Sequence, residues 1–142
     1  MNAPGEDEGR RRWDAARAFA LSLPNAEEDS PWDDVVVKVR LKPGVPPWRK
    51  FGEGVYGPMF LWLGRREVDT PSVSVKLSRS HDAAVAIAGA TPTTMSGLGQ
   101  WGWLTVMVDR VDGDLIEDWI EESYRNVAPK RIVAELDRSR SG

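Results

Sequence analysis

The first apolar pattern along the chain predicts a helix that begins near Glu8. Apolar residues recur there at steps of three and four, which places them along one stripe of a helix. The stripe consists of Trp13, Ala16, Phe19, Ala20 and Leu23. We expect the helix to end at Pro24 and Asn25, because proline breaks the hydrogen-bond ladder and asparagine tolerates a left-handed turn. Residues 25–34, NAEEDSPWDD, then indicate a loop.

Three strands are expected in the middle of the chain. In residues 35–42, VVVKVRLK, apolar and mostly basic positions alternate, so one side of this strand is apolar and the other carries cations. Residues 59–64, MFLWLG, are apolar on both sides, and residues 72–77, SVSVKL, alternate again. Between the first two strands, residues 42–58 hold four prolines and four glycines, which predicts a long irregular connection or a wide hairpin tip.

The second half of the chain begins with a short helix over residues 81–88, which Ser80 can cap and Gly89 ends. A short strand over residues 91–95 and a longer one over residues 101–109 follow. The last long helix starts near Asp112 or Asp114, is interrupted at Pro129 and continues over residues 129–137. Its inward stripe is Leu115, Ile116, Trp119, Ile120, Ser123 and Val127, and its solvent side is Glu117, Asp118, Glu121, Glu122 and Arg125.

The expected order is helix, three strands, helix, two strands, helix. Short links between strands favour an antiparallel sheet, so the sequence predicts a two-layer α+β fold with the helices on one face of the sheet. A chain of 142 residues indicates one domain, which we place at residues 8–138 with flexible tails at 1–7 and 139–142.

Gly97, Gly99 and Gly102 have the G-x-G-x-x-G spacing of a dinucleotide-binding loop. Such a loop follows a strand and opens a helix, whose first amides hold the pyrophosphate. Here the glycines lead into WLTVMVD, whose alternating β-branched residues predict a strand instead. We therefore interpret them as a tight turn and a kinked strand start that lets a neighbouring backbone come close.

Composition narrows the possible chemistry. The chain has no cysteine and one histidine, His81, which excludes disulfides, thiolate catalysis and cysteine-based zinc sites. The acidic residues around Pro31 lack the spacing of a calcium loop. We therefore expect no catalytic residues, no cofactor and no metal. No apolar run approaches the about 18 residues of a membrane span, and residues 1–12 lack the apolar stretch of a signal peptide, so a cytoplasmic location is expected.

The second face of the predicted sheet holds the candidate site. If helices cover the valine side, the opposite side presents basic and hydroxyl side chains together with aromatic rings. These are Lys38, Arg40, Lys42, Ser72, Ser74 and Lys76, with Trp101, Trp103, Thr105 and Met107 from residues 101–109, and Phe60 or Trp62 can join them. Cations that meet phosphates beside rings that stack are typical of nucleic-acid binders. The alternative is that Trp101 and Trp103 pack under residues 48–58 as a satellite core.

Three stretches of the sequence, LSLPNAEEDSPW, GLGQWGWLTV and WIEESYRNVAPKRIVAEL, together resemble the MmcQ/YjbR family of small bacterial proteins. The resemblance covers about residues 18–136. The family usually has glycine in place of Asn25, and Gln100 stands where relatives often have a basic residue. The resemblance implies an α-β-β-β-α-β-β-α fold like that of secretion chaperones. The family is commonly labelled DNA-binding because its sheet is similar to a phage double-wing domain, which is an analogy of fold.

Two functions follow from this face as hypotheses. The first is a non-catalytic cytoplasmic domain that binds duplex DNA, with Lys38, Arg40, Lys42 and Lys76 on phosphates and Trp101 and Trp103 as ring contacts. Turn residues Arg49, Lys50, Arg65 and Arg66 would add wing-tip cations. The second is a module that binds a protein or a small ligand through the same face, which suits the net charge of −3 better than a polyanion does. Neither hypothesis involves a membrane.

Overall fold

The computed structural model describes residues 4–30, 34–41, 57–68, 71–93 and 95–141. Its helices and strands follow the predicted two-layer α+β order, which is confirmed. In chain order they are α1 (Pro4–Leu21), β1 (Ala26–Asp29), β2 (Val35–Val39), β3 (Met59–Leu63), β4 (Ser72–Lys76), α2 (His81–Ala88), β5 (Thr91–Pro92), β6 (Trp103–Met107), α3 (Gly113–Val127) and α4 (Lys130–Ser141). Two 3₁₀ helices, η1 (Met95–Trp101) and η2 (Val108–Arg110), flank β6.

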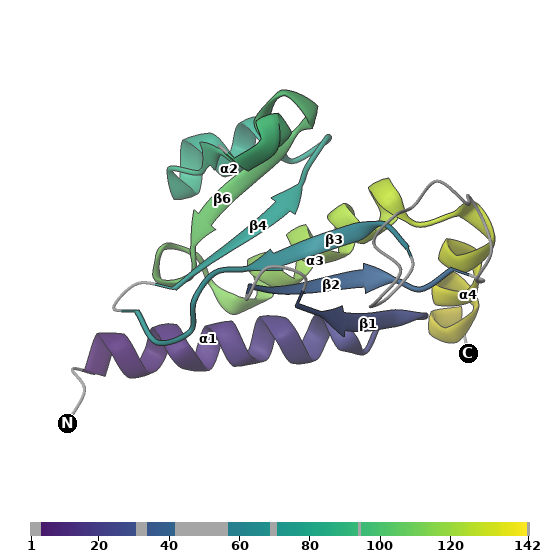
Figure 1. The fold of residues 1–142 in the computed structure, drawn as a ribbon, viewed down its shortest axis with the longest axis horizontal. Coiled ribbons are helices and arrows are strands. Elements are labelled where there is room, and N and C mark those ends of the chain that lie inside the picture. Colours follow the sequence, from purple (N-terminus) through teal and green to yellow (C-terminus); the bar gives the residue numbers. More distant parts are fainter. Residues whose placement is uncertain (1–3, 31–33, 42–56, 69–70, 94, 142) are drawn as a thin grey trace.

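The strands form one antiparallel sheet in the order β1-β2-β3-β4-β6-β5. Figure 1 looks onto this sheet, with α3 behind it, α1 along its lower edge and α2 at the top beside the start of β6. One row across the sheet pairs Val37 with Leu61, Leu61 with Val75 and Val75 with Leu104, and all four side chains are buried in the core. The predicted inward face is therefore confirmed, and no described helix covers the opposite face, which is toward the viewer in Figure 1. We call this the helix-free face.

The loop predicted over residues 25–34 is wrong in its first half, because Ala26–Asp29 forms the edge strand β1. This strand pairs antiparallel with β2 over four residue pairs, from Ala26 with Val39 to Asp29 with Val36. Asn25 starts the turn with φ of 61°, the left-handed conformation that asparagine tolerates, and its side-chain amide donates to the Arg40 carbonyl. The strand was missed because acidic residues have low β propensity and show no apolar alternation.

A β-bulge corrects the predicted place of Phe60. Val37 pairs with Leu61 but Lys38 pairs with Met59, so Phe60 is an extra residue in β3. The bulge turns this side chain into the core, where its ring meets Tyr124 of α3 edge to face, with centroids 5.2 Å apart. Phe60 therefore does not join the helix-free face of the sheet, whereas Trp62 does.

The glycine-rich segment shapes the start of β6, as the sequence analysis interpreted it. Gly102 has φ of 92°, and a β-carbon placed there would lie 2.9 Å from the Leu77 carbonyl oxygen. Gly99 lies equally close to its neighbour, since its β-carbon would lie 2.8 Å from Cβ of Pro92. The segment leads into a strand rather than a helix, which is inconsistent with the phosphate-binding geometry of a dinucleotide loop.

Replacing Gly102 by alanine is expected to lower the free energy of unfolding by about 2 kcal/mol, because a positive φ and a backbone clash must both be accommodated. Gly113→Ala is the matched control, since a β-carbon at this first residue of α3 has no neighbour within 4 Å. Urea denaturation of both variants measures the difference. Equal stability of the two variants would contradict the assigned role of Gly102.

Several predicted boundaries also shift. α1 begins at Pro4 instead of Glu8, and α4 continues to Ser141, so residues 4–7 and 139–141 belong to helices. Proline suits the first turn of a helix because its missing N–H has no partner there anyway. The predicted strands over 91–95 and 101–109 shorten to β5 and β6, because residues 95–101 wind into η1.

Candidate functional site

The helix-free face of the sheet carries the side chains that the sequence placed there. Ser74 lies opposite Thr105, Ser72 opposite Met107 and Lys76 opposite Trp103, in rows that alternate with the core rows. Of the two tryptophans, Trp101 is 64 % exposed in η1, whereas Trp103 is only 5 % exposed. Trp62, the cross-strand partner of Ser74, is also buried. The indole rings of this face are therefore mostly covered, and Trp101 is the accessible one of the three.

The first two predicted phosphate contacts are engaged with carboxylates. Lys38 Nζ lies 2.8 Å from Asp29 Oδ2, and Arg40 Nη1 lies 2.8 Å from Glu27 Oε1. Both carboxylates belong to β1, the strand that the sequence analysis missed. Opposite charges on paired strands stabilise the pairing, so these two cations have a structural role at the sheet edge.

Arg66, one of the predicted wing-tip cations, is held in the same way. Its Nε and Nη2 atoms each donate to an Asp14 carboxylate oxygen at 2.8 Å, and Nη1 donates to Glu67. The hydrogen bonds that Arg66 donates to Asp14, and then the one to Glu67, raise the pKa of Arg66, and the same bonds to Asp14 lower the pKa of that carboxyl group. A two-pronged guanidinium–carboxylate pair has a fixed geometry, so this side chain ties the turn before β4 to α1.

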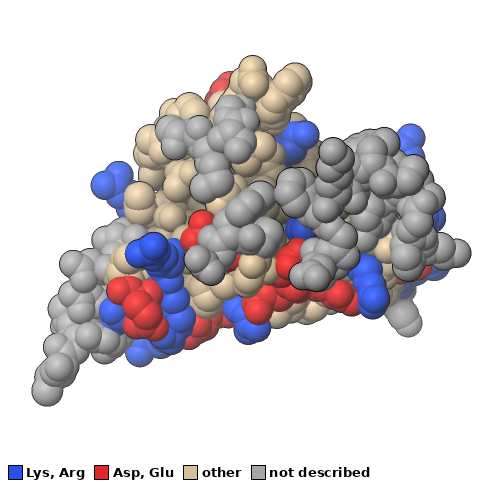
Figure 2. Space-filling model, in the orientation of Figure 1, with Lys and Arg blue, Asp and Glu red and all other residues tan. Residues whose placement is uncertain are grey.

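The remaining predicted cations differ from these. Lys76 and Arg65 have no carboxylate partner among the residues that the structure describes. Lys42, Arg49 and Lys50 lie outside the described residues. Figure 2 shows the consequence: blue and red side chains are intermixed along the lower edge, over α1 and β1, and the described surface above them, where grey does not cover it, is mostly tan. The described part of this face is not a continuous basic field.

A shallow pocket opens in the middle of the same face. It has a volume of about 190 Å³ and is lined by Asp34, Trp62, Gly64, Ser72, Ser74, Thr93 and Thr105. The hollow exists because the neighbouring strands place small side chains side by side here. Gly64 has the closest fit, since a β-carbon there would lie 2.5 Å from Ser72 Oγ. The Trp62 indole forms the large wall.

Three hydroxyl groups form a chain along one side of this pocket. Thr105 Oγ1 lies 2.8 Å from Ser74 Oγ and 3.1 Å from Thr93 Oγ1. Three hydroxyl hydrogens serve two internal hydrogen bonds, so the chain keeps one donor at one end and open lone pairs along its length. Either direction of donation is possible, and the chain can therefore present an acceptor or a donor to a ligand.

Two further polar groups of the pocket have no internal partner. Neither the Asp34 carboxylate nor the Ser72 hydroxyl makes a hydrogen bond or ion pair within the described ranges. Polar groups in a hollow without internal partners are available to a ligand or to water. The sequence pattern places Ser72, Ser74 and Thr105 on this face without indicating a role for them, and it places Asp34 in the loop predicted over residues 25–34.

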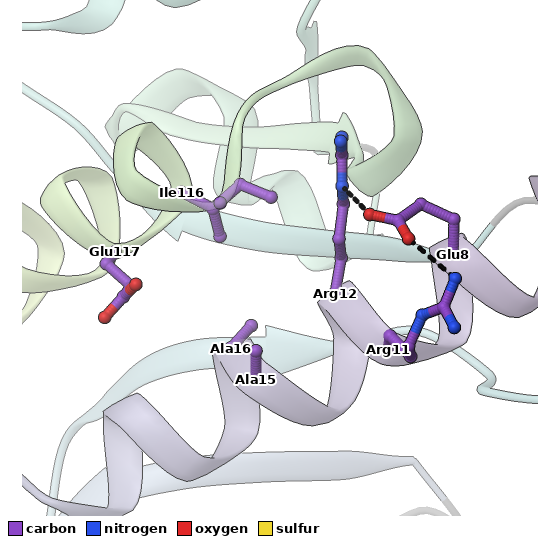
Figure 3. A pocket seen from close by; sticks show the side chains of 8 residues that line it. Glu8, Arg11, Arg12, Ala15, Ala16, Ile116 and Glu117 are labelled. Atoms are coloured by element: carbon purple, nitrogen blue, oxygen red, sulfur yellow. Dashed lines mark hydrogen bonds and ion pairs between the residues drawn. The ribbon is translucent and has the colours of Figure 1, made fainter.

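A separate cleft between α1 and α3 has a volume of about 250 Å³. Figure 3 shows Glu8 at one end of it, between the guanidinium groups of Arg11 and Arg12. Their hydrogen bonds, Arg11 first, lower the pKa of Glu8. Arg12 also donates to the carbonyls of Val108 and Val111. The hydrogen bonds of these charged groups go to one another and to backbone carbonyls, so the groups hold α1 against η2 and we do not assign them to a ligand site.

Comparison with known proteins identifies the family of this chain. A model of the YjbR family matches residues 21–126. The chain belongs to the YjbR family. The resemblance seen in the sequence is thereby confirmed. No curated protein matches the chain.

Among solved structures, this YjbR protein is similar to the crystal structure of the Deinococcus radiodurans protein DR2400, which carries a DUF419 domain. The two chains are 20 % identical, the match covers 85 % of this chain and 84 % of that one, and the TM-score is 0.60. At this identity the similarity establishes the fold. None of the described helices combines the length and apolar character needed to cross a bilayer.

The YjbR motif ESYRNVAPKR has a structural role in this chain. Glu122 is buried, which corrects its predicted place on the solvent side of the helix. Its carboxylate accepts hydrogen bonds from the Ser78 amide, the Ser80 amide and the Ser80 hydroxyl, so Ser80 does not cap α2 through its side chain. Burial raises the pKa of Glu122, but these hydrogen bonds and nearby Arg79 outweigh it and leave the pKa lowered. The motif thus fixes the chain between β4 and α2.

Ser123 and Asn126 of the same motif hold the end of β4. The Ser123 hydroxyl donates to the Phe60 carbonyl at 2.6 Å and accepts from the Lys76 amide at 2.8 Å. Asn126 donates to the Lys76 carbonyl. Ser123 and Asn126 therefore contact this chain's own backbone on the helix side of the sheet, away from the pocket.

Proposed function

We propose that this YjbR protein is a cytoplasmic small-ligand-binding domain whose site is the pocket on the helix-free face of the sheet. One observation carries the proposal: the pocket combines a carboxylate and a hydroxyl that have no partner among the described residues with a hydroxyl chain and an indole wall. A hollow with a few convergent polar groups beside apolar surface is the usual form of a ligand site. Three cations that would have favoured a polyanion, Lys38, Arg40 and Arg66, are bound to carboxylates instead.

The size of the pocket limits the ligand. Sites for drug-sized molecules enclose roughly 300–1,000 Å³, and this pocket measures about 190 Å³. The ligand, or the part of it that enters, is therefore a small polar group. Such a ligand binds in the millimolar to high micromolar range, because few atoms limit the attainable free energy.

The matched pair Thr105→Val and Thr91→Val tests the site. The two residues are cross-strand neighbours on β6 and β5, but only Thr105 lines the pocket and joins the hydroxyl chain. We screen small polar compounds by amide chemical shifts and expect shifts at Ser74, Thr93 and Thr105 in the wild type. Thr105→Val is expected to weaken binding about tenfold, and Thr91→Val to leave it unchanged. Shifts confined to other parts of the molecule would refute the proposal.

DNA binding is the second candidate, and Lys76, Arg65 and Trp101 favour it. The two cations lack carboxylate partners among the described residues, and the indole ring is accessible. If duplex DNA binds, Lys76→Ala with Arg65→Ala should reduce the slope of log affinity against log salt by about 1–2 units. Lys38→Ala with Arg40→Ala should reduce this slope less, because both cations are paired with carboxylates of β1. Tryptophan fluorescence at several salt concentrations measures both slopes. An effect only in the second variant would contradict the structural role of these ion pairs.

A further inference from the structure

We infer that the ligand of this pocket is a small organic ammonium ion. The inference rests on the proposed function and adds to it the charge of the ligand. Asp34 is the one charged residue among the seven described residues that line the pocket, so this described part of the lining carries one negative charge. A partly enclosed carboxylate favours a cationic partner over a neutral or anionic one.

The surroundings of Asp34 differ from those of the neighbouring carboxylates. On β1, Glu27 and Asp29 lie on the same helix-free face, where Asp29 is bound by Lys38 of β2 and Glu27 by Arg40, the residue that follows β2. Asp34 directly precedes β2, yet no cation of the described chain reaches it. Within the described ranges, the fold therefore supplies internal counter-ions to Glu27 and Asp29 at this edge of the sheet and none to Asp34 at the pocket.

The other walls suit the same ligand. An ammonium group has three N–H donors and no acceptor, so it needs several oxygens around it. The Asp34 carboxylate and the lone pairs of the chain formed by Ser74, Thr105 and Thr93 provide them. The Trp62 indole adds an aromatic wall, and an indole face attracts cations more strongly than the other aromatic side chains do.

Ser72 indicates a second polar group on the ligand. Its hydroxyl lies in contact range of Gly64 and makes no hydrogen bond to another described residue. It can accept or donate one bond, so it fits a hydroxyl or ether oxygen a few atoms from the nitrogen. An amino alcohol has this combination of groups and fits within about 190 Å³.

Three probes of nearly equal size separate charge from shape: ethanolamine, ethylene glycol and glycolate. Each is titrated into the full chain at pH 7 while the amide signals of Ser74, Thr93 and Thr105 are followed. We expect ethanolamine to bind in the millimolar range and at least about tenfold more tightly than ethylene glycol, and glycolate to bind more weakly still. Asp34→Asn keeps the shape of the side chain and should remove the advantage of ethanolamine while leaving ethylene glycol unaffected.

Asp118→Asn is the control for the change of net charge, because this exposed carboxylate lies on α3 and not at the pocket. It should leave all three affinities unchanged. If ethylene glycol or glycolate shifts the pocket amides as strongly as ethanolamine does, the ammonium inference fails and the proposed function stands. If no probe shifts these amides, both fail. An equal loss of ethanolamine binding in the two variants also overturns the inference, because it reports long-range charge rather than a contact.

Discussion

Tyr124→Ala is expected to lower the free energy of unfolding by about 4 kcal/mol. Tyr124 is the largest fully buried side chain of the core. Its ring meets Phe60 edge to face, and its hydroxyl donates to the Pro24 carbonyl at 2.8 Å across the end of α1. Truncation therefore removes a buried ring contact, leaves a cavity at the bulge of β3 and leaves a carbonyl without its donor. Denaturant unfolding followed by tryptophan fluorescence measures the change.

Tyr124→Phe separates the ring from the hydroxyl. It is expected to cost about 1 kcal/mol, the value of one hydrogen bond with its partner left behind. Burial, with a smaller contribution from Glu135, raises the pKa of Tyr124 to about 12, so the hydroxyl remains a donor across the neutral range. A cost for Tyr124→Ala no larger than that for Tyr124→Phe would show that the ring does not stabilise the core.

Ser123→Ala is expected to cost about 3 kcal/mol, which is large for the loss of one hydroxyl group. The β3–β4 pairing covers only Leu61–Leu63 against Val73–Val75, and the bulge at Phe60 ends it. The Phe60 carbonyl and the Lys76 amide lie beyond this point, and the buried Ser123 hydroxyl bridges them. Alanine would remove the hydrogen-bond partner of the buried Phe60 carbonyl and of the partly buried Lys76 amide, at about 1–3 kcal/mol for each group left unsatisfied.

Ser141→Ala is the matched control for this loss. Its hydroxyl donates to the Asp137 carbonyl within α4, but the side chain is exposed, so water can replace the bond. The change in stability should stay below about 0.5 kcal/mol. Hydrogen exchange of the Lys76 amide should accelerate in Ser123→Ala alone. If the two serine variants unfold at the same urea concentration, α3 does not complete the sheet as described.

Much of this architecture could be predicted because the spacing of apolar residues along the chain indicates which side of a helix or strand is buried. The alternation of Val35, Val37 and Val39 predicted the core face of β2 correctly, and the spacing of Trp119 and Ile120 predicted the buried side of α3. The glycine motif was also interpreted correctly, since the residues after Gly102 have a strand pattern. In each case local side-chain chemistry and tertiary packing favour the same conformation.

Features that depend on strand pairing could not be predicted in this way. Residues 26–29 form a strand because β2 offers hydrogen bonds and cations opposite their carboxylates, and neither property is visible in AEED itself. The bulge at Phe60 depends on the register of two strands separated by a long connection. Because β1 was missed, Lys38 and Arg40 were expected to be available for phosphates.

The pocket could not be predicted from the sequence either, because it also depends on strand pairing. The sequence predicted the correct face for Ser72, Ser74 and Thr105. The hydroxyl chain also requires that Ser74 pair with Thr105 across the sheet and that Thr93, which follows β5, lie within hydrogen-bond distance of Thr105. Asp34 looked like one acidic residue among several before a strand. Only its position beside Gly64 and Ser72 distinguishes it from the others. The sequence does contain one signal for the pocket. The two serines of β4 point away from the core, where a strand that packs under other side chains would carry apolar residues.

The central claim is that this protein binds its ligand in the pocket on the helix-free face of the sheet, and not on a basic surface. Amide chemical shifts of one isotope-labelled sample, titrated separately with ethanolamine and with a short DNA duplex at low salt, test it most directly. We predict saturable shifts at Ser74, Thr93 and Thr105 with the amine, and no shifts at these residues with the duplex. Salt-dependent shifts across the sheet face with the duplex, and none with the amine, would contradict it.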